Sequence, residues 1–251
     1  GFVCGLAAAT KYNAVLLVVP VFVAEILRLL ESPHRHGRSL VARWWRPGLA
    51  FCVAFLIGIP FVVLDTERFL AAMAALRQAV QLGQGRVLSP APASSGWLYH
   101  LQVSLRHGLG APLLVAGLAG MAAILVRTPK IGLVLFSFPI AYYAVAGSLQ
   151  LLFVRYVIPI TPFLCLAAAW LVCAAADRLA ALLPTPRRAL CASLIAVASS
   201  LVVAAPSAVS VWQFDSLISR PDNRVVVARW VNAHVPVNSS VLQSGSPYGH
   251  A

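Results

Sequence analysis

Long apolar runs alternate with short polar segments along most of the chain. A helix that crosses the hydrocarbon core of a bilayer needs about 20 mostly apolar residues. Six runs reach that length once flanking small and aromatic residues are included, and they lie at 12–30, 47–64, 110–126, 131–147, 156–176 and 189–208. The pattern predicts an all-α polytopic membrane protein with about six transmembrane helices, and residues 1–9 predict part of a further one. Because the chain opens inside an apolar run without a Met, we expect an internal fragment of a longer protein.

The segment 65–109 is too long to be a simple connection between two spans. Within it, four apolar residues recur at spacings of 4, 3 and 4, which places them on one helical face. They are Phe69, Met73, Leu76 and Val80. We therefore expect an amphipathic helix that lies on the outer leaflet over about 68–82. The Gly-, Pro- and Ser-rich residues that follow predict a loop.

The last segment, 209–251, is the most polar part of the chain. Its pattern predicts a short helix from Asp222 to Val235, ended by a proline, and a strand that opens at 240–243. A helix followed by a strand is how a small soluble domain would begin. We therefore divide the chain into a multi-span transmembrane domain, 1–208, and the truncated beginning of an extracytoplasmic domain.

Composition excludes the soluble and the disordered classes of protein. Apolar residues make up 60% of the chain, whereas Asp, Glu, Lys and Arg together make up 10%. A soluble fold carries about a quarter of its residues as charges, and a disordered chain carries few apolar residues. The formal net charge of +12 would by itself suggest a nucleic-acid partner, so its placement along the chain matters.

The basic residues are concentrated in the connections on one side of the predicted spans. Ten of the 19 lie in three short connections, at Arg28, Arg35, Arg38, Arg43, Arg46, Arg127, Lys130, Arg178, Arg187 and Arg188. Since cytoplasmic connections are enriched in Lys and Arg, this side is predicted to be cytoplasmic, with 65–109 and 209–251 outside. The basic residues then set the orientation of the spans in the membrane. They imply membrane lipids as partners and no nucleic acid.

Metal and nucleotide chemistry find no support in the sequence. The five cysteines lie in apolar sequence at spacings unlike those of metal ligands, so we expect small buried hydrophobic residues. A Gly-rich phosphate loop is missing, which argues against a nucleotide-hydrolysing site. We identify no cofactor, and a divalent metal is compatible with the chemistry but not indicated. The sequence does not specify an oligomeric state.

Lys11 is the first candidate for a functional role, because it is one of only two lysines and has apolar sequence on both sides. An ionisable residue at the edge of a span is a candidate site for an anionic head group, and Tyr12 follows it. The alternative is an interfacial lysine whose ammonium extends to water. Thr10 is expected to cap the helix that begins here.

Arg155 and Tyr156 form the second candidate, at the outer start of the fifth predicted span. A guanidinium binds phosphate in a forked geometry, and a phenol adds a donor. Ordinary membrane anchoring by an Arg-Tyr pair is the alternative. For Tyr142 and Tyr143, near the outer end of the preceding span, we favour an interfacial aromatic belt over a position that lines the same cavity.

Three residues of the outer segment remain. His100 could bond a sugar or phosphate, although a structural or solvated histidine is the more common case. Asp65 and Glu67 could act as a base or a metal ligand. We favour instead a cap by Asp65 or Thr66, with Glu67 next to the positive end of the helix.

Four stretches resemble the family 39 glycosyltransferases, the polytopic sugar transferases related to protein mannosyltransferases and aminoarabinose transferases. They are 5–14 followed by an apolar helix with a proline, 90–100, 155–162, and 222–236. The resemblance implies a membrane enzyme that moves a sugar from a polyprenyl-phosphate donor to a lipid, glycan or protein acceptor on the outer face. It implies a catalytic aspartate in a first outer loop, which would lie before Gly1, so the catalytic base is not assigned here. It assigns the donor phosphate to Lys11, Arg155 and Tyr156, beside which Tyr12 and His100 complete our candidate substrate-binding set.

Two other functions fit the same pattern. A lipid or polysaccharide transporter or flippase would be a non-enzyme, and it would more often show broken helices and mid-membrane polar residues. An O-antigen ligase or polymerase would also use arginines on the outer face.

Overall fold

The computed structural model describes residues 1–31, 40–82, 96–149, 152–184 and 187–240. Over these residues every regular element is a helix, as the apolar runs predict. The loop expected after the amphipathic helix lies almost entirely outside the described residues, as does the strand expected at 240–243 apart from its first residue. The chain divides into two units, 1–207 and 208–251, and the boundary falls inside one long helix, so each unit is considered by itself.

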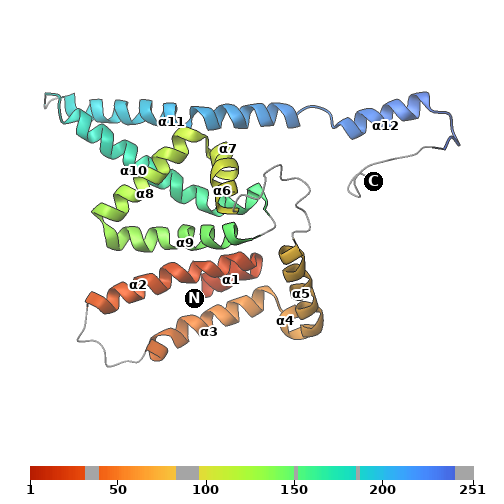
Figure 1. Cartoon of the computed structure of the whole chain (residues 1–251), viewed down its shortest axis with the longest axis horizontal. Helices are drawn as coiled ribbons and strands as arrows, with labels where there is room; N and C mark the ends of the chain where they lie inside the picture. The colour runs from red at the N-terminus through yellow and green to blue at the C-terminus, as the bar shows by residue number, and fades with distance from the viewer. Residues whose placement is uncertain (32–39, 83–95, 150–151, 185–186, 241–251) are drawn as a thin grey trace. The chain divides into compact units, whose positions relative to one another are not determined.

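In the first third of the chain the helices are α1 (Phe2–Thr10), the 3-10 helix η1 (Tyr12–Leu17), α2 (Val18–Glu31), α3 (Leu40–Gly58), α4 (Phe61–Leu64) and α5 (Thr66–Leu82). The helices that follow are α6 (Gly96–Tyr99), the π-helix η4 (His100–Leu105), α7 (Arg106–Leu109), α8 (Ala111–Arg127), α9 (Pro129–Ser148), the 3-10 helix η5 (Val154–Ile160), α10 (Thr161–Ala180), α11 (Arg188–Ile218) and α12 (Asn223–His234) (Figure 1).

Four stretches among the described residues are long and apolar enough to cross a membrane: 12–31, 129–148, 154–180 and one that begins at Arg188. A fifth is formed if 96–109 and 111–127, which meet at 113°, are taken as one bent span. The part of α3 from Trp44 to Gly58 is apolar but shorter. The helices therefore fit a membrane protein. A helix occupies each of the six predicted positions, while a count of six spans stays a prediction.

The core of the first unit is formed where α8, α9 and α10 pack together. Glycines allow α8 and α10 to approach closely, since a Cβ at Gly120 would overlap the backbone oxygen of Ala167 and one at Gly117 would lie 2.9 Å from that of Leu164. Small residues at such crossings are how helices pack in a bilayer, where lipid competes equally for apolar side chains. Phe136 and Ala167 are fully buried at this junction.

Helix α2 runs antiparallel to α9, and the two lie side by side (Figure 1). At one end of the pair, Lys130 Nζ lies 2.5 Å from Glu31 Oε1. Both side chains are more than half exposed, so this ion pair contributes at most about 1 kcal/mol to stability. It does establish that the predicted cytoplasmic ends of these two helices lie together.

The sharp bend between α7 and α8 is made at Gly110, whose φ of 73° is the left-handed region that glycine adopts without steric cost. The α7 carbonyl freed at the bend is satisfied by a side chain, because the Ser207 hydroxyl donates to the Leu109 oxygen. Because of this bend, residues 96–109 do not continue along the axis of α8.

The amphipathic helix expected at 68–82 is present as α5, beginning two residues earlier. Asp65 caps it, since its Oδ1 accepts a hydrogen bond from the Arg68 backbone N–H at 3.3 Å. The predicted helix near the end of the chain is α12, capped by Asp222, whose carboxylate accepts from the Arg224 N–H at 2.7 Å.

Two sequence expectations are wrong. Thr10 does not cap the following helix: it ends α1, and its hydroxyl donates back to the Leu6 carbonyl at 3.0 Å, because the break in helical geometry comes one residue later. The cysteines are free but not buried: Cys4 and Cys191 are half-buried, and Cys52, Cys165 and Cys173 are exposed. A bilayer places apolar surroundings on the outside of a helix bundle, so an apolar sequence context does not imply burial.

Candidate functional site

Three irregular helical segments gather at the end of the first unit opposite the Glu31–Lys130 pair. The 3-10 helices η1 and η5 both contact α9, and the π-helix η4 contacts η5. Departures from α-helical geometry of this kind are frequent at functional positions. Two of them begin the long apolar stretches that continue as α2 and α10, so the residues they carry lie where these stretches start.

Asn13 and Tyr142 connect the first of these segments to α9. The Asn13 side-chain amide donates to the Tyr142 hydroxyl, with Nδ2 and Oη 3.4 Å apart. Tyr142 is 3% exposed, so its ring belongs to the core. An aromatic belt, the interpretation favoured from sequence, is therefore wrong for Tyr142. Its hydroxyl is bonded by Asn13 instead. Asn13 was not singled out by its sequence context, although it closes the polar run that begins at Thr10.

Arg155 and Tyr156 lie on η5, close to the same tyrosine. The Arg155 guanidinium lies over the Phe153 ring, 4.5 Å from its centroid, and the Tyr156 ring meets Phe153 edge to face at 5.3 Å. Helix η5 contacts α9, and its Val157 belongs to the same buried cluster as Tyr142. Stacking on an aromatic face holds a guanidinium plane while its edge remains available to an anion.

Lys11 lies at the break between α1 and η1, in extended backbone with φ −152° and ψ 118°. Its side chain is exposed, and so is that of Tyr12, whose ring contacts Phe69 of α5 edge to face at 6.4 Å. Neither Lys11 nor Arg155 has an acidic partner among the residues that the structure describes. Arg155 thus lies on η5 and Lys11 directly precedes η1, and both of these helices contact α9.

His100 is fully buried on η4, at 0% exposed. Its Nδ1 lies 3.0 Å from the Ser104 hydroxyl, four residues on, whereas its buried Nε2 has no hydrogen-bond partner among the described residues. Contact of His100 with a substrate stays a prediction. Asp65 serves as a cap, as favoured from sequence.

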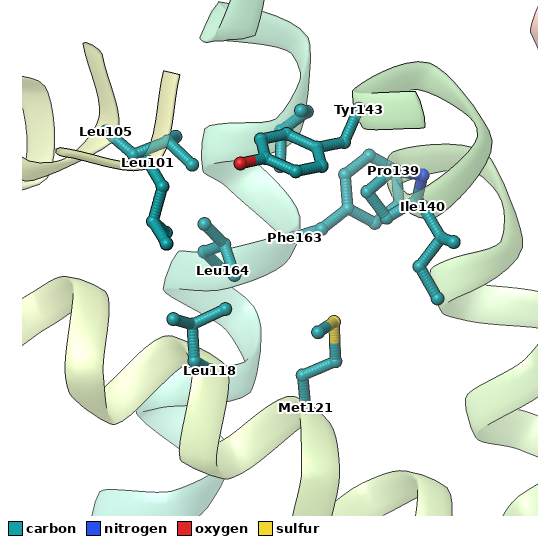
Figure 2. A pocket seen from close by; sticks show the side chains of 10 residues that line it. Leu101, Leu105, Leu118, Met121, Pro139, Ile140, Tyr143, Phe163 and Leu164 are labelled. Atoms are coloured by element: carbon teal, nitrogen blue, oxygen red, sulfur yellow. The ribbon is translucent and has the colours of Figure 1, made fainter. Parts of the chain in front are cut away.

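An apolar cavity of about 320 Å³ lies next to this cluster, between η4, α8, α9 and the start of α10. Its walls are the side chains of Leu101, Leu105, Leu118, Met121, Pro139, Ile140, Tyr143, Ile160, Phe163 and Leu164. Figure 2 shows the Tyr143 ring at its side, with the hydroxyl directed towards Leu101 and Leu105. Tyr143 thus lines a cavity, which is the position that the sequence analysis disfavoured. Ile160 belongs to the same short helix as Arg155, so the cavity and the cationic residue share one element.

The described part of the chain contains no group of three His, Cys, Asp or Glu side chains placed to hold a metal ion. The geometry does provide an amide bonded to a buried phenol, Asn13 to Tyr142, and an exposed guanidinium on η5, the helix whose Ile160 lines the apolar cavity. Such a set can bind a ligand that combines an anionic head with an apolar chain.

Comparison with known proteins gives no family assignment. No protein-family model, curated protein or solved structure matches the chain.

Proposed function

We propose that the protein is a membrane glycosyltransferase that takes a sugar from a polyprenyl-phosphate donor and transfers it on the extracytoplasmic face of a bacterial inner membrane. The observation that supports this most is the convergence of η1, η5 and α9 at the end opposite the dense basic connections. In support, Asn13 bonds Tyr142 of α9, and Arg155 and Tyr156 lie on η5, which contacts the same helix.

In this proposal Arg155 holds the donor phosphate through the edge of its guanidinium, while Phe153 supports the plane of that group. Tyr156 donates a hydrogen bond to the same phosphate, and Lys11 with Tyr12 approaches it from η1. As the bond to the sugar breaks, negative charge grows on the leaving phosphate, and cations already in position stabilise it. The first units of the prenyl chain occupy the apolar cavity.

The general base of the reaction is not among the residues assigned here. The resemblance to family 39 glycosyltransferases implies an aspartate in an outer loop for this role. Asp65 is engaged as the cap of α5, so we give it no catalytic role.

The deciding experiment is sugar transfer from a polyprenyl-phosphate sugar by the full-length protein in lipid nanodiscs. Arg155→Ala and Lys11→Ala are each expected to lower kcat/KM for the donor by about tenfold or more, the low end for losing a hydrogen bond to a charged group. Arg155→Lys should recover part of the loss, because a point charge replaces the fork.

Lys130→Ala is the matched control, since it removes an exposed cation at the other end of the α2–α9 pair. It should transfer sugar like the wild type. Unchanged transfer in both Arg155→Ala and Lys11→Ala would remove the phosphate site. Movement of a labelled lipid across the membrane without any sugar transfer would instead favour the transporter alternative.

A further inference from the structure

We infer that Trp97 is a positioning residue, which fixes the place of Arg155 and Tyr156 by clamping the end of α9 from which their segment departs. The catalytic importance of Trp97 rests on the proposed function. The coupling between the contacts of Trp97 and the position of η5 is a property of the fold. We use the name Trp97 clamp for the contacts that Gly96 and Trp97 make with Tyr143, Ala144 and Gly147.

The Trp97 clamp has two hydrogen bonds that run in opposite directions. The Trp97 indole Nε1–H donates to the Ala144 carbonyl at 3.1 Å, and the Tyr143 hydroxyl donates to the Trp97 carbonyl at 2.5 Å. The residues joined in this way are 47 and 46 positions apart in the chain. Both side chains must therefore keep their orientation for α6 to stay on α9.

The contact surface is formed by two glycines. A Cβ added at Gly147 would overlap Cδ1 of the Trp97 ring, and one added at Gly96 would overlap the Gly147 carbonyl oxygen. Only the absence of these side chains lets the indole lie directly on the last turn of α9. Any larger residue at Gly147 must displace the Trp97 ring and with it the bond to Ala144.

The connection to η5 starts at this place. Helix α9 ends one residue after Gly147, and η5 begins at Val154. Leu152, in between, lies against Gly96, where a Cβ would come 2.9 Å from its Cδ2. On the far side, η4, which continues directly from α6, contacts η5. The α6–η4 segment therefore contacts the end of α9, where the connection to Arg155 begins, and η5, where it ends.

This arrangement gives a role to the Tyr143 hydroxyl, which takes no part in the proposed phosphate site. The Tyr143 hydroxyl holds α6 to α9, while His100 and Ser104 bond each other within η4, the segment that continues from α6.

The test measures the accessibility of a reporter next to Arg155. The purified full-length protein carries a single cysteine in place of Val154, which is 49% exposed, in a background where the native cysteines are replaced. The rate of maleimide labelling is compared between the parent and Gly147→Ala. The control is Gly108→Ala, because an added Cβ there meets no atom within 4 Å. A second reporter, Ser219→Cys, lies in the other unit of the chain.

We expect Gly147→Ala to change the labelling rate at residue 154 by about threefold or more, the low end of coupling between groups in contact. The rate at residue 219 should not change, and Gly108→Ala should alter neither rate. Tyr143→Phe, which removes only one hydroxyl, should shift the labelling rate at residue 154 in the same direction. It replaces Gly147→Ala as the test variant if Gly147→Ala does not fold.

An unchanged rate at residue 154 in both variants overturns the inference, and so does an equal change at 154 and 219, which would mean general loosening. Sugar transfer separates this result from the proposed function. If the wild type transfers no sugar, the proposed function fails while the labelling rates still decide the coupling. If it does, Tyr143→Phe should raise the donor KM more than it lowers kcat.

Discussion

The Asn13 side-chain amide donates to the Tyr142 hydroxyl across 129 positions of sequence, with the two atoms 3.4 Å apart. Together with the Glu31–Lys130 ion pair at the other end, this bond fixes the register of α2 on α9. The two polar contacts lie at opposite ends of one antiparallel helix pair. They divide the residues of that pair into a group near Arg155 and a group near the basic connections.

A double-mutant cycle on Asn13→Ala and Tyr142→Phe should give a coupling free energy of about 0.5 kcal/mol, since a long hydrogen bond with one exposed partner contributes little. The measurement is the free energy of unfolding in detergent. Strictly additive effects of the two substitutions would show that the bond does not exist in solution.

Gly120→Ala should destabilise the protein by about 1–3 kcal/mol, because the new methyl group meets the Ala167 backbone and the two helices must separate. Ordinary helix propensity acts in the other direction, since alanine favours helix over glycine. Gly108→Ala has no such obstacle and should leave the melting temperature unchanged or slightly raised. Similar melting temperatures for both variants would contradict the close α8–α10 crossing.

Substitutions of Asp65 distinguish a helix cap from a catalytic base. Asparagine caps a helix as well as aspartate does, but it cannot accept a proton. We therefore expect Asp65→Asn to keep both stability and sugar transfer, whereas Asp65→Ala should lose about 1 kcal/mol of stability through α5. Loss of transfer in Asp65→Asn at full stability would restore a catalytic role for this carboxylate.

Filling the apolar cavity should weaken binding of the donor chain. Met121→Trp places a large ring in the space lined by Leu118 and Phe163 and should raise the donor KM by about tenfold. Val126→Trp, on the exposed side of the same helix, is the control and should leave the KM unchanged. An equal KM for both variants would show that the chain binds elsewhere.

The predicted sidedness is tested by labelling single cysteines in intact cells. A cysteine in place of Ser219 should react with an impermeant maleimide, and one in place of Lys130 should react only after the membrane is opened. The reason is the concentration of ten basic residues on the Lys130 side. The reverse pattern would place Lys11, Arg155 and Tyr156 on the cytoplasmic side, which would contradict the proposed binding of a donor on the outer face.

The helical class and the place of the long apolar helices were predictable from sequence, because a bilayer demands long apolar runs with internally satisfied backbone. The short helices α6, η4 and α7 over 96–109 were not predicted. Asp65 and Asp222 were predictable as helix starts, since a cap depends on residues within one turn. Thr10 was not, because its hydroxyl had a second acceptor in the preceding turn and the end of α1 is set by the backbone at Lys11.

Partners far apart in the chain were decided only by the tertiary structure. Lys11 and Arg155 could be singled out as cations in apolar sequence, but nothing local showed that their segments would meet on α9. The inward position of Tyr142 and the Trp97 clamp depend on which face of each helix packs, and in a bilayer both faces are apolar. Sequence by itself thus determined which segments are helices and which end of each carries charge. Helix packing, through small residues and a few polar bonds, determined which of these ends lie together.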